Sequence, residues 1–191
     1  DVAAQYIVLP LHLGVFPVSI KAVLEVYPPH AISDGDAFLV NHPYIGGSPH
    51  APDMCIIVPV FIENELSYFT ASIAHKSDIG GSVPGSCSGK ATDIYSEGMH
   101  FPPIRFVTQR SISPEVETII RANSRSPDLV MGDIRGQLGC GWLGSERIRE
   151  LVGKYGRQMI DQAIVQRIAK VEQTIRREFA LWKDGSASGD R

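Results

Sequence analysis

A short motif, His-x-x-Asp, occurs twice in this sequence, on either side of a stretch with the pattern of a β-hairpin. The first copy runs from His50 to Asp53, and the second runs from His75 to Asp78. Between them, two apolar runs rich in β-branched and aromatic residues flank a polar Glu-Asn-Glu turn, which predicts two antiparallel strands. With the turn centred near Asn64, Asp53 and His75 each lie eleven residues from it, so the ladder places them opposite each other. His50 and Asp78 are then expected to face each other one step further out.

The open end of this hairpin is a candidate metal site. Directly opposed residues in an antiparallel ladder have Cβ atoms about 4.5–5.5 Å apart, which would bring two imidazoles and two carboxylates together. Borderline and hard divalent metals, namely Zn, Mn, Fe and Co, accept this mixed set of nitrogen and oxygen ligands. The alternative is that each motif is a local side-chain pair or a turn cap. A single copy of the motif would favour the local pair or turn cap, whereas two copies placed symmetrically about a hairpin favour a metal site. The spacing alone leaves both interpretations open.

Two further histidines and one loop accompany these motifs. His12 lies between two leucines, which favours a core or edge histidine over a ligand. His42 belongs to a loop rich in Pro and Gly, residues 41–49, where capping of its own loop is favoured over a role as an extra ligand. The glycine-rich segment 80–89 matches neither a P-loop nor a dinucleotide fingerprint. Its backbone N–H groups suit an anion, but a tight bend over the site is the favoured interpretation.

Composition argues against several classes of function. The net charge is -3 and the chain has no basic run, so a nucleic-acid-binding protein is not indicated. No apolar stretch reaches the roughly 18 uncharged residues that a membrane helix needs. The three cysteines, Cys55, Cys87 and Cys140, are widely spaced and odd in number, which indicates free thiols in a reducing cytoplasm.

The order of the predicted elements indicates an α+β fold. Residues 1–108 are expected to form a β- and loop-rich half that carries the metal site. Residues 109–184 are expected to form a helical region of the same domain, ending in a long amphipathic helix, and residues 185–191 a flexible tail. One predicted helix starts at Pro17 and another starts after the Ser113 cap. Three more are predicted over residues 133–143, 145–154 and 159–182. Because the chain does not begin with Met, we expect it to be a portion of a longer polypeptide.

Several short motifs follow one another in an order that is typical of one family. These motifs are Asp34-Gly-Asp36, Asn41-His-Pro-Tyr-Ile-Gly-Gly47, His50-x-Pro-Asp53, Ala74-His75-x-x-Asp78-Ile-Gly-Gly81, Pro84-Gly-Ser86, Ala91-Thr-Asp-Ile-Tyr95, Glu97-Gly98, Pro102-Pro103, Ile120-Arg-Ala-Asn-Ser-Arg125 and Pro127-Asp-Leu-x-x-Gly-Asp-Ile-Arg135. Together they resemble the hydantoinase B/oxoprolinase family, whose members are the metal-bearing subunits of ATP-dependent hydantoinases, lactamases, 5-oxoprolinases and acetone and acetophenone carboxylases. The resemblance covers nearly all of the chain.

The resemblance implies a metal centre, a substrate and partners. The positions that match the family's His/Asp centre are His50, Asp53, His75 and Asp78. The implied partners are a hydantoinase A-type subunit that binds ATP and Mg, and the remaining portion of this chain's own, far longer subunit. The implied substrate is a cyclic amide, namely a hydantoin, a lactam or 5-oxoproline, whose ring is opened after the partner has activated it with ATP.

Three residues are candidates for catalysis beside the metal. Glu97 is the first candidate general acid or base and Asp93 the second, with a helix cap or a surface carboxylate as the alternative for each. Lys76 stands where family members often have a second histidine, and we expect it to stabilise negative charge or to pair with an acid such as Asp93. The loop before His50 is also one residue longer than the commonest form in the family.

Three other functions stay open at this point. In the carboxylase branch of the family, the same centre receives an activated enol and a carboxyl donor. A non-catalytic assembly piece would use the metal only to fold the hairpin end and its long helix to dock a partner. A metallohydrolase that needs no ATP is the third alternative.

Overall fold

The computed structural model describes residues 2–4, 9–12, 14–186 and 188–189 of the 191-residue chain. The chain divides into two compact units, one comprising Tyr6–Glu150 and the other Leu151–Arg191 together with the first five residues. The first unit contains the β-sheet and every candidate site residue. The assignment of residues 109–184 to one domain with residues 1–108 stays a prediction, as does the flexible tail.

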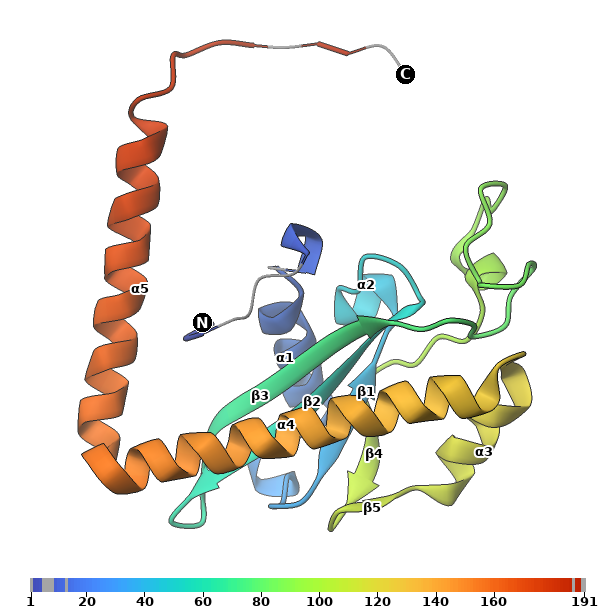
Figure 1. The fold of residues 1–191 in the computed structure, drawn as a ribbon, viewed down its shortest axis with the longest axis horizontal. Coiled ribbons are helices and arrows are strands. Elements are labelled where there is room, and N and C mark those ends of the chain that lie inside the picture. The colour runs from blue at the N-terminus through green and yellow to red at the C-terminus, as the bar shows by residue number, and fades with distance from the viewer. Residues whose placement is uncertain (1, 5–8, 13, 187, 190–191) are drawn as a thin grey trace. The chain divides into compact units, whose positions relative to one another are not determined.

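A five-stranded antiparallel sheet lies at the centre of the first unit (Figure 1). Its strands are β1 (Ala37–Val40), β2 (Asp53–Ile62), β3 (Glu65–His75), β4 (Ile104–Thr108) and β5 (Ser111–Ile112). They are arranged in the order β3-β2-β1-β4-β5, with every neighbouring pair antiparallel. Helices dominate the chain after β5, and the predicted α+β fold is confirmed.

The β2–β3 hairpin has the predicted register at its open end, but its turn has two residues and not the predicted three, since Glu65 already pairs with Ile62. Glu63 and Asn64 form the turn with φ values of 49° and 65°, the positive values that a type I′ turn requires. The ladder skips Ser67, which forms a one-residue bulge in β3. At its far end the ladder pairs Asp53 with His75, as the sequence predicted.

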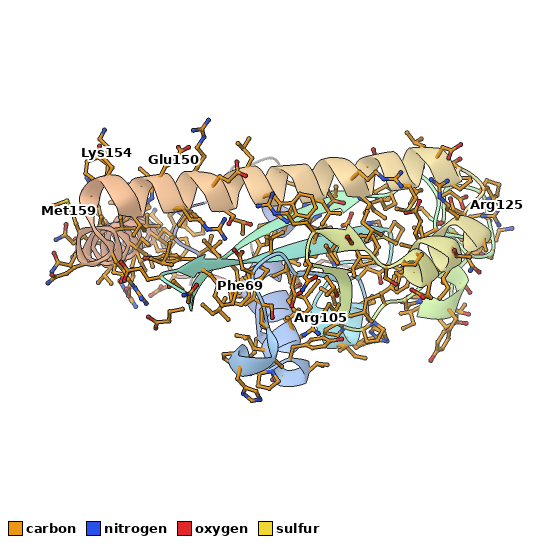
Figure 2. All side chains as sticks on the ribbon, turned by 90° about the horizontal axis from the view of Figure 1, so that it is seen from below. Phe69, Arg105, Arg125, Glu150, Lys154 and Met159 are labelled. Carbon is orange, nitrogen blue, oxygen red and sulfur yellow. The ribbon has the colours of Figure 1, made fainter. Side chains whose placement is uncertain are left out.

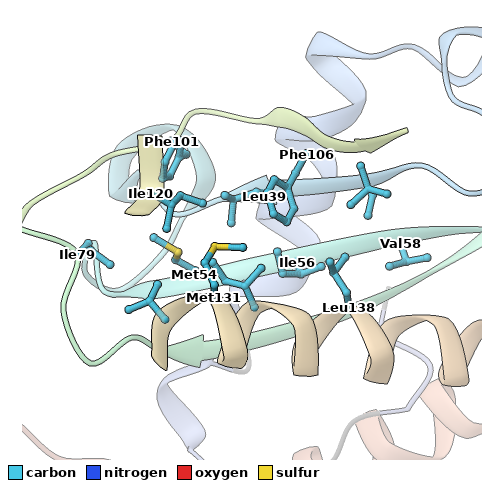
Figure 3. Close-up of a cluster of buried hydrophobic side chains, with 14 of the residues drawn as sticks. Leu39, Met54, Ile56, Val58, Ile79, Phe101, Phe106, Ile120, Met131 and Leu138 are labelled. Carbon is cyan, nitrogen blue, oxygen red and sulfur yellow. The ribbon is translucent and has the colours of Figure 1, made fainter. Parts of the chain in front are cut away.

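Both faces of β1 and β2 are covered, so these strands are apolar at nearly every position. One face is covered by α3 (Pro114–Asn123) and by the part of α4 (Pro127–Tyr155) that ends at Glu150. The other face is covered by α1 (Val15–Val26). Figure 2 shows α4 along one face and Arg105 on the opposite side. The core on the α4 side includes Leu39, Met54, Ile56, Val58, Ile120, Met131, Ile134 and Leu138 (Figure 3). The core on the α1 side contains Val23, Ile32, Phe38, Val40, Cys55 and Ile57.

The helices differ from the prediction mainly after residue 126. α3 begins at the predicted cap, where Ser113 Oγ accepts a hydrogen bond from the N–H of Val116. α1 begins two residues before Pro17. The prediction of two helices over 133–143 and 145–154 is wrong, because α4 is continuous. The remaining helical elements are η1 (Pro10–His12), η2 (Pro29–Ala31), α2 (Pro43–Gly46), η3 (Ile94–Glu97) and α5 (Arg157–Phe179).

Glycines inside α4 allow the helix to lie close to the hairpin. A Cβ atom at Gly141 would lie 2.7 Å from Cγ2 of Val58, and one at Gly144 would lie 3.0 Å from Cγ2 of Thr70. The hydroxyl of Thr70 also donates to the carbonyl oxygen of Gly141 at 2.8 Å. Both glycines therefore serve the packing of a continuous helix against the hairpin.

Within the described ranges, no helix is long and apolar enough to span a membrane. Cys55 is buried, Cys87 and Cys140 are exposed, and all three are free thiols, as predicted. The cytoplasmic location stays a prediction.

We predict opposite effects for two alanine substitutions in α4. Gly141→Ala should lower the free energy of unfolding by about 1–2 kcal/mol, because the added methyl overlaps Val58 in a packed interface. Gly139→Ala is the matched control, since a Cβ there meets nothing within 4 Å. It should raise the free energy of unfolding by about 0.5–1 kcal/mol through helix propensity. Chemical denaturation measures both, and equal effects would contradict the close approach.

Candidate metal centre

Asp53, the first residue of β2, is the hub of the candidate site. Its Oδ2 lies 3.0 Å from Nε2 of His12 and 3.1 Å from Nε2 of His50. Its Oδ1 lies 3.5 Å from Nδ1 of His75, which is itself 3.2 Å from Nε2 of His50. The exposed fraction of the side chains rises from 4% for Asp53 and 15% for His12 to 30% for His50 and 48% for His75. The cluster is therefore buried on the carboxylate side and open on the side of His75.

Polar side chains hold the loop that carries His50. The amide of Asn41, which is buried, donates to the carbonyl oxygen of Ala51 at 2.6 Å. A carboxylate oxygen of Glu97 accepts from the N–H of the same Ala51 at 3.0 Å. Both hydrogen bonds fix the backbone of Ala51, the residue next to His50. They therefore help to hold the His50 imidazole in its place in the cluster.

The glycine-rich loop brings Cys87 to the same cluster. Its Sγ lies 3.9 Å from Nδ1 of His50, and the donor atoms of His50, His75 and Cys87 all lie within 4.8 Å of one another. Burial raises the pKa of the Cys87 thiol, and the nearby carboxylates of Glu97 and Asp53 raise it further. The predicted bend of this loop over the site agrees with the observed position of Cys87.

Asp78 does not face His50, and its carboxylate binds the glycine-rich loop instead. Oδ1 accepts hydrogen bonds from the N–H groups of Gly80 and Arg125, at 3.0 and 3.1 Å. Oδ2 accepts from the N–H of Gly85 at 2.9 Å and from Nη1 of Arg125 at 3.0 Å. Burial alone raises the pKa of Asp78, but these four hydrogen bonds lower it to about 2. The anion that the loop's N–H groups bind is thus the chain's own carboxylate.

Arg125, in the turn between α3 and α4, holds the rest of this loop (Figure 2). Its guanidinium donates to three backbone carbonyls of the loop, those of Gly80, Gly81 and Val83. Arg125 therefore ties the loop that carries Cys87 to the helical layer of the molecule. No sequence motif for catalysis pointed to this residue, although it ends one of the family motifs.

Lys76 is buried between the end of β3 and α4. Its Nζ donates to Oε1 of Gln137 at 2.6 Å and to a backbone carbonyl of β3 at 2.9 Å. Burial lowers the pKa of Lys76 to about 8, with the negative charges of Asp133 and Asp53 opposing that shift. Lys76 thus joins β3 to α4, and the expected pair with Asp93 is not found. The ammonium is held in the protein interior, and the catalytic role of Lys76 stays a prediction.

Asp93 and His42 have the capping roles that were the alternatives to chemistry. A carboxylate oxygen of Asp93 accepts from the N–H of Ser96 at the start of η3. Nδ1 of His42 accepts from the N–H of Ile45 at the start of α2. Among the carboxylates proposed for catalysis, Glu97 lies nearer to the cluster, through its bond to the His50 loop.

The atoms around Asp53 suit a divalent metal. Two ligands of one metal ion, each about 2.0–2.2 Å from it, lie about 3.0–3.5 Å apart. Nε2 of His50 lies 3.2 Å from Nδ1 of His75 and 3.1 Å from Oδ2 of Asp53, and Nδ1 of His75 lies 3.5 Å from the other carboxylate oxygen, Oδ1. A carboxylate with two imidazoles is also a chemically suitable set of ligands. On the buried side, His12 is placed to orient the carboxylate as an outer partner.

His12 and Cys87 are the site residues that the sequence interpretation missed. His12 lies 41 residues before Asp53, and no spacing rule connects a lone histidine in an apolar run to a distant motif. Cys87 had a weak signal, because it lies in a glycine-rich loop directly after the second motif. A loop predicted to bend over the site makes each of its side chains a candidate neighbour.

The fold and this cluster define a class of protein: an α+β chain whose central hairpin ends in a His/Asp site. The hydantoinase B/oxoprolinase family matches residues 1–191, and the chain belongs to this family. The chain is 34% identical, over 184 residues, to the B-type component of a putative D-/L-hydantoinase from a Pseudomonas species, covering 95% of this chain and 31% of that protein. It is 29% identical to the acetophenone carboxylase delta subunit of Aromatoleum aromaticum, covering 92% of this chain and 25% of that protein.

A solved structure has the same fold. The crystal structure of the ATP-dependent caprolactamase from Pseudomonas jessenii matches 92% of this chain with a TM-score of 0.83 and 29% sequence identity. The match covers 30% of the caprolactamase chain. The chain thus spans about a third or less of the relatives that it matches.

We predict that Asp78 stabilises the fold in a pH-dependent way. Its pKa lies below the ordinary value of 3.8, so its contribution is complete above about pH 4 and is lost as the pH falls toward 2. Asp78→Asn should lower the free energy of unfolding at pH 7 by about 2–4 kcal/mol and flatten its decline between pH 4 and 2. Denaturation curves at several pH values measure this effect.

The exposed Asp128, which pairs with Arg121, is the matched control. Asp128→Asn should change the free energy of unfolding by less than about 1 kcal/mol. If the free energy of unfolding of Asp78→Asn fell below pH 4 as steeply as that of the wild type, the assignment of this pH dependence to Asp78 would be contradicted.

Proposed function

We propose that this chain is the metal-bearing part of an ATP-dependent amidase that opens a cyclic amide. The observation that carries the proposal is the position of the Asp53 carboxylate between the imidazoles of His50 and His75. Membership of the hydantoinase B/oxoprolinase family supports it, as does the similarity to a putative hydantoinase and to an ATP-dependent caprolactamase. His50, Asp53 and His75 are the proposed metal ligands.

The residues of this chain have distinct roles in the proposal. A divalent metal held there, of the group Zn, Mn, Fe and Co, supplies a Lewis acid for the amide carbonyl. Asp53 contributes the negative charge that attracts the cation, and His12 fixes the orientation of this carboxylate. Glu97 holds the His50 loop and remains our candidate general acid or base. Asp78 is left out of the ligand set because its oxygens bind the loop and Arg125.

The need for ATP has a chemical reason. Hydrolysis of an unstrained amide in water is slow and, for some rings, thermodynamically uphill, so coupling to ATP hydrolysis drives it. The sequence of this chain contains neither a P-loop nor a dinucleotide fingerprint. We therefore propose that ATP and Mg are bound by a partner subunit, which activates the substrate, and that the rest of this chain's own subunit completes the site.

The carboxylase branch is the second candidate. It is favoured by the similarity to the acetophenone carboxylase delta subunit, at 29% identity over 176 residues. The amidase proposal is preferred because the putative hydantoinase has the higher identity, 34% over 184 residues.

We predict that metal binding requires the side chains at the open end of the β2–β3 hairpin. Wild-type protein purified without chelators should contain close to one divalent metal ion per chain, and His75→Ala and Asp53→Ala should each lose it. His30→Ala is the matched control, because His30 is exposed on η2 and lies outside the cluster. Elemental analysis measures the content, and metal retained in both cluster variants would contradict the assignment.

We also predict ATP-dependent ring opening by the complete enzyme. The full subunit that contains this chain, combined with its ATP-binding partner, should convert a hydantoin, a lactam or 5-oxoproline to the ring-opened acid and consume ATP. Asp53→Asn should lower kcat at least about 100-fold, whereas His30→Ala should not change it. Chromatographic product analysis with and without ATP measures this.

Two outcomes would contradict the amidase proposal. Ring opening that proceeds equally without ATP would indicate an ordinary metallohydrolase. Carboxylation of a ketone in the presence of bicarbonate and ATP, with no ring opening, would indicate the carboxylase branch.

A further inference from the structure

The loop that carries Cys87 is fixed at several points just before this residue. Ser86 is buried, and its Oγ accepts from the N–H of Ile79 and donates to the carbonyl oxygen of Gly80, both at 2.8 Å. The preceding residue, Gly85, donates its N–H to the Asp78 carboxylate. Cys87 is therefore held over the histidine cluster by the fold of the loop.

We propose that Cys87 is an additional ligand of the metal centre, so that a thiolate joins the carboxylate and the two imidazoles. This inference rests on the proposed centre formed by His50, Asp53 and His75. Cys87, His50 and His75 each offer one donor atom within 4.8 Å of the other two. The 3.9 Å contact of Cys87 Sγ is with Nδ1 of His50, whereas Nε2 of the same ring faces Asp53 and His75. A sulfur and a nitrogen bound to one Zn ion lie about 3.5 Å apart, at bond lengths of about 2.3 and 2.0 Å.

The remaining gap is small enough for the side chain to close. The donor atoms of Cys87, His50 and His75 lie within 4.8 Å of one another, so the sulfur has to approach the imidazole nitrogens by at most about 1.3 Å to reach the separation of shared ligands. Cys87 is exposed and has one side-chain torsion, so a rotation about χ1 moves the sulfur without moving the anchored backbone.

Thiolate ligation changes the chemistry of the centre. On binding, the metal ion replaces the thiol proton, which leaves to solvent, and no electron is transferred. The charges of Asp53 and of the Cys87 thiolate then balance the two charges of the cation. Because thiolate is a soft ligand, this set favours Zn over the harder Mn, which narrows the metals that the sequence left open.

A different role for Cys87 is compatible with the same distances. With Nε2 of His50 on the metal, its Nδ1–H would point toward the sulfur, and Cys87 would then be a hydrogen-bond partner of a ligand and not a ligand itself. The two roles differ in whether sulfur is bonded to the metal, which spectroscopy measures directly.

The test is the absorption spectrum of the protein loaded with Co(II). Wild-type protein should show the visible bands of protein-bound cobalt together with a near-ultraviolet band from thiolate-to-cobalt charge transfer. Cys87→Ser should retain the visible bands and lose the charge-transfer band. Cys140→Ser is the matched control, because Cys140 is also exposed but lies on α4, and it should retain both.

Zinc binding and thiol protection give a second measurement on the same proteins. Competition with a chromophoric chelator should show a Zn dissociation constant at least about tenfold higher for Cys87→Ser than for the wild type or Cys140→Ser. In the wild type, Zn should slow the alkylation of Cys87 by iodoacetamide and leave that of Cys140 unchanged.

The outcomes separate this inference from the proposed function. Visible cobalt bands without a charge-transfer band in the wild type, with Cys87 fully alkylated in the presence of Zn, would overturn the ligand role and leave the His50–Asp53–His75 centre intact. No cobalt spectrum at all in the wild type would overturn both proposals.

Discussion

The register of the β2–β3 hairpin is the constraint on which the site depends. A two-residue turn at Glu63 and Asn64 would, in a regular ladder, set Asp53 opposite residue 74. The bulge at Ser67 adds one residue to β3 and moves His75 into that position. Since side chains alternate between the two faces, the same hairpin without the bulge would direct His75 away from Asp53. One extra residue in an edge strand thus determines whether the carboxylate and the imidazole meet.

The two His-x-x-Asp motifs are alike in sequence but not in structure. In the first copy, both His50 and Asp53 belong to the cluster, because a short loop returns the histidine to the end of β2. In the second copy, His75 ends β3 and belongs to the cluster, whereas Asp78 binds the N–H groups of the glycine-rich loop and Arg125. The second aspartate still serves the site, since it orders the loop that carries Cys87. The first copy of the motif therefore supplies two candidate ligands. The second copy supplies one candidate ligand, His75, and the aspartate that anchors the glycine-rich loop.

The sequence predicted those features that depend on local chemistry. The position of the hairpin turn and the Ser113 cap follow from residues that are neighbours in the chain. The pairing of Asp53 with His75 was predicted from a three-residue turn without a bulge, and it is observed because the Ser67 bulge replaces the residue that the two-residue turn lacks. His12 and Arg125 were not predicted as site residues, because each reaches its partner across more than 40 residues. The continuity of α4 was missed for a similar reason, since the predicted break fell at Gly144, whose close approach to Thr70 of β3 cannot be seen in the sequence. The same is true of Lys76, whose burial depends on where α4 lies.

The uneven exposure of the cluster bears on how it can work. Asp53 and His12 lie on the buried side, where the carboxylate has fixed partners and a cation would be attracted to a charge that solvent screens poorly. His75 and Cys87 lie on the open side, where ligands can exchange and a substrate can approach. A structural metal site is normally closed on all sides by the protein, whereas a catalytic one keeps an accessible position. This arrangement agrees with the catalytic centre that we propose, in which the rest of the subunit and an ATP-binding partner would meet the substrate on the open side.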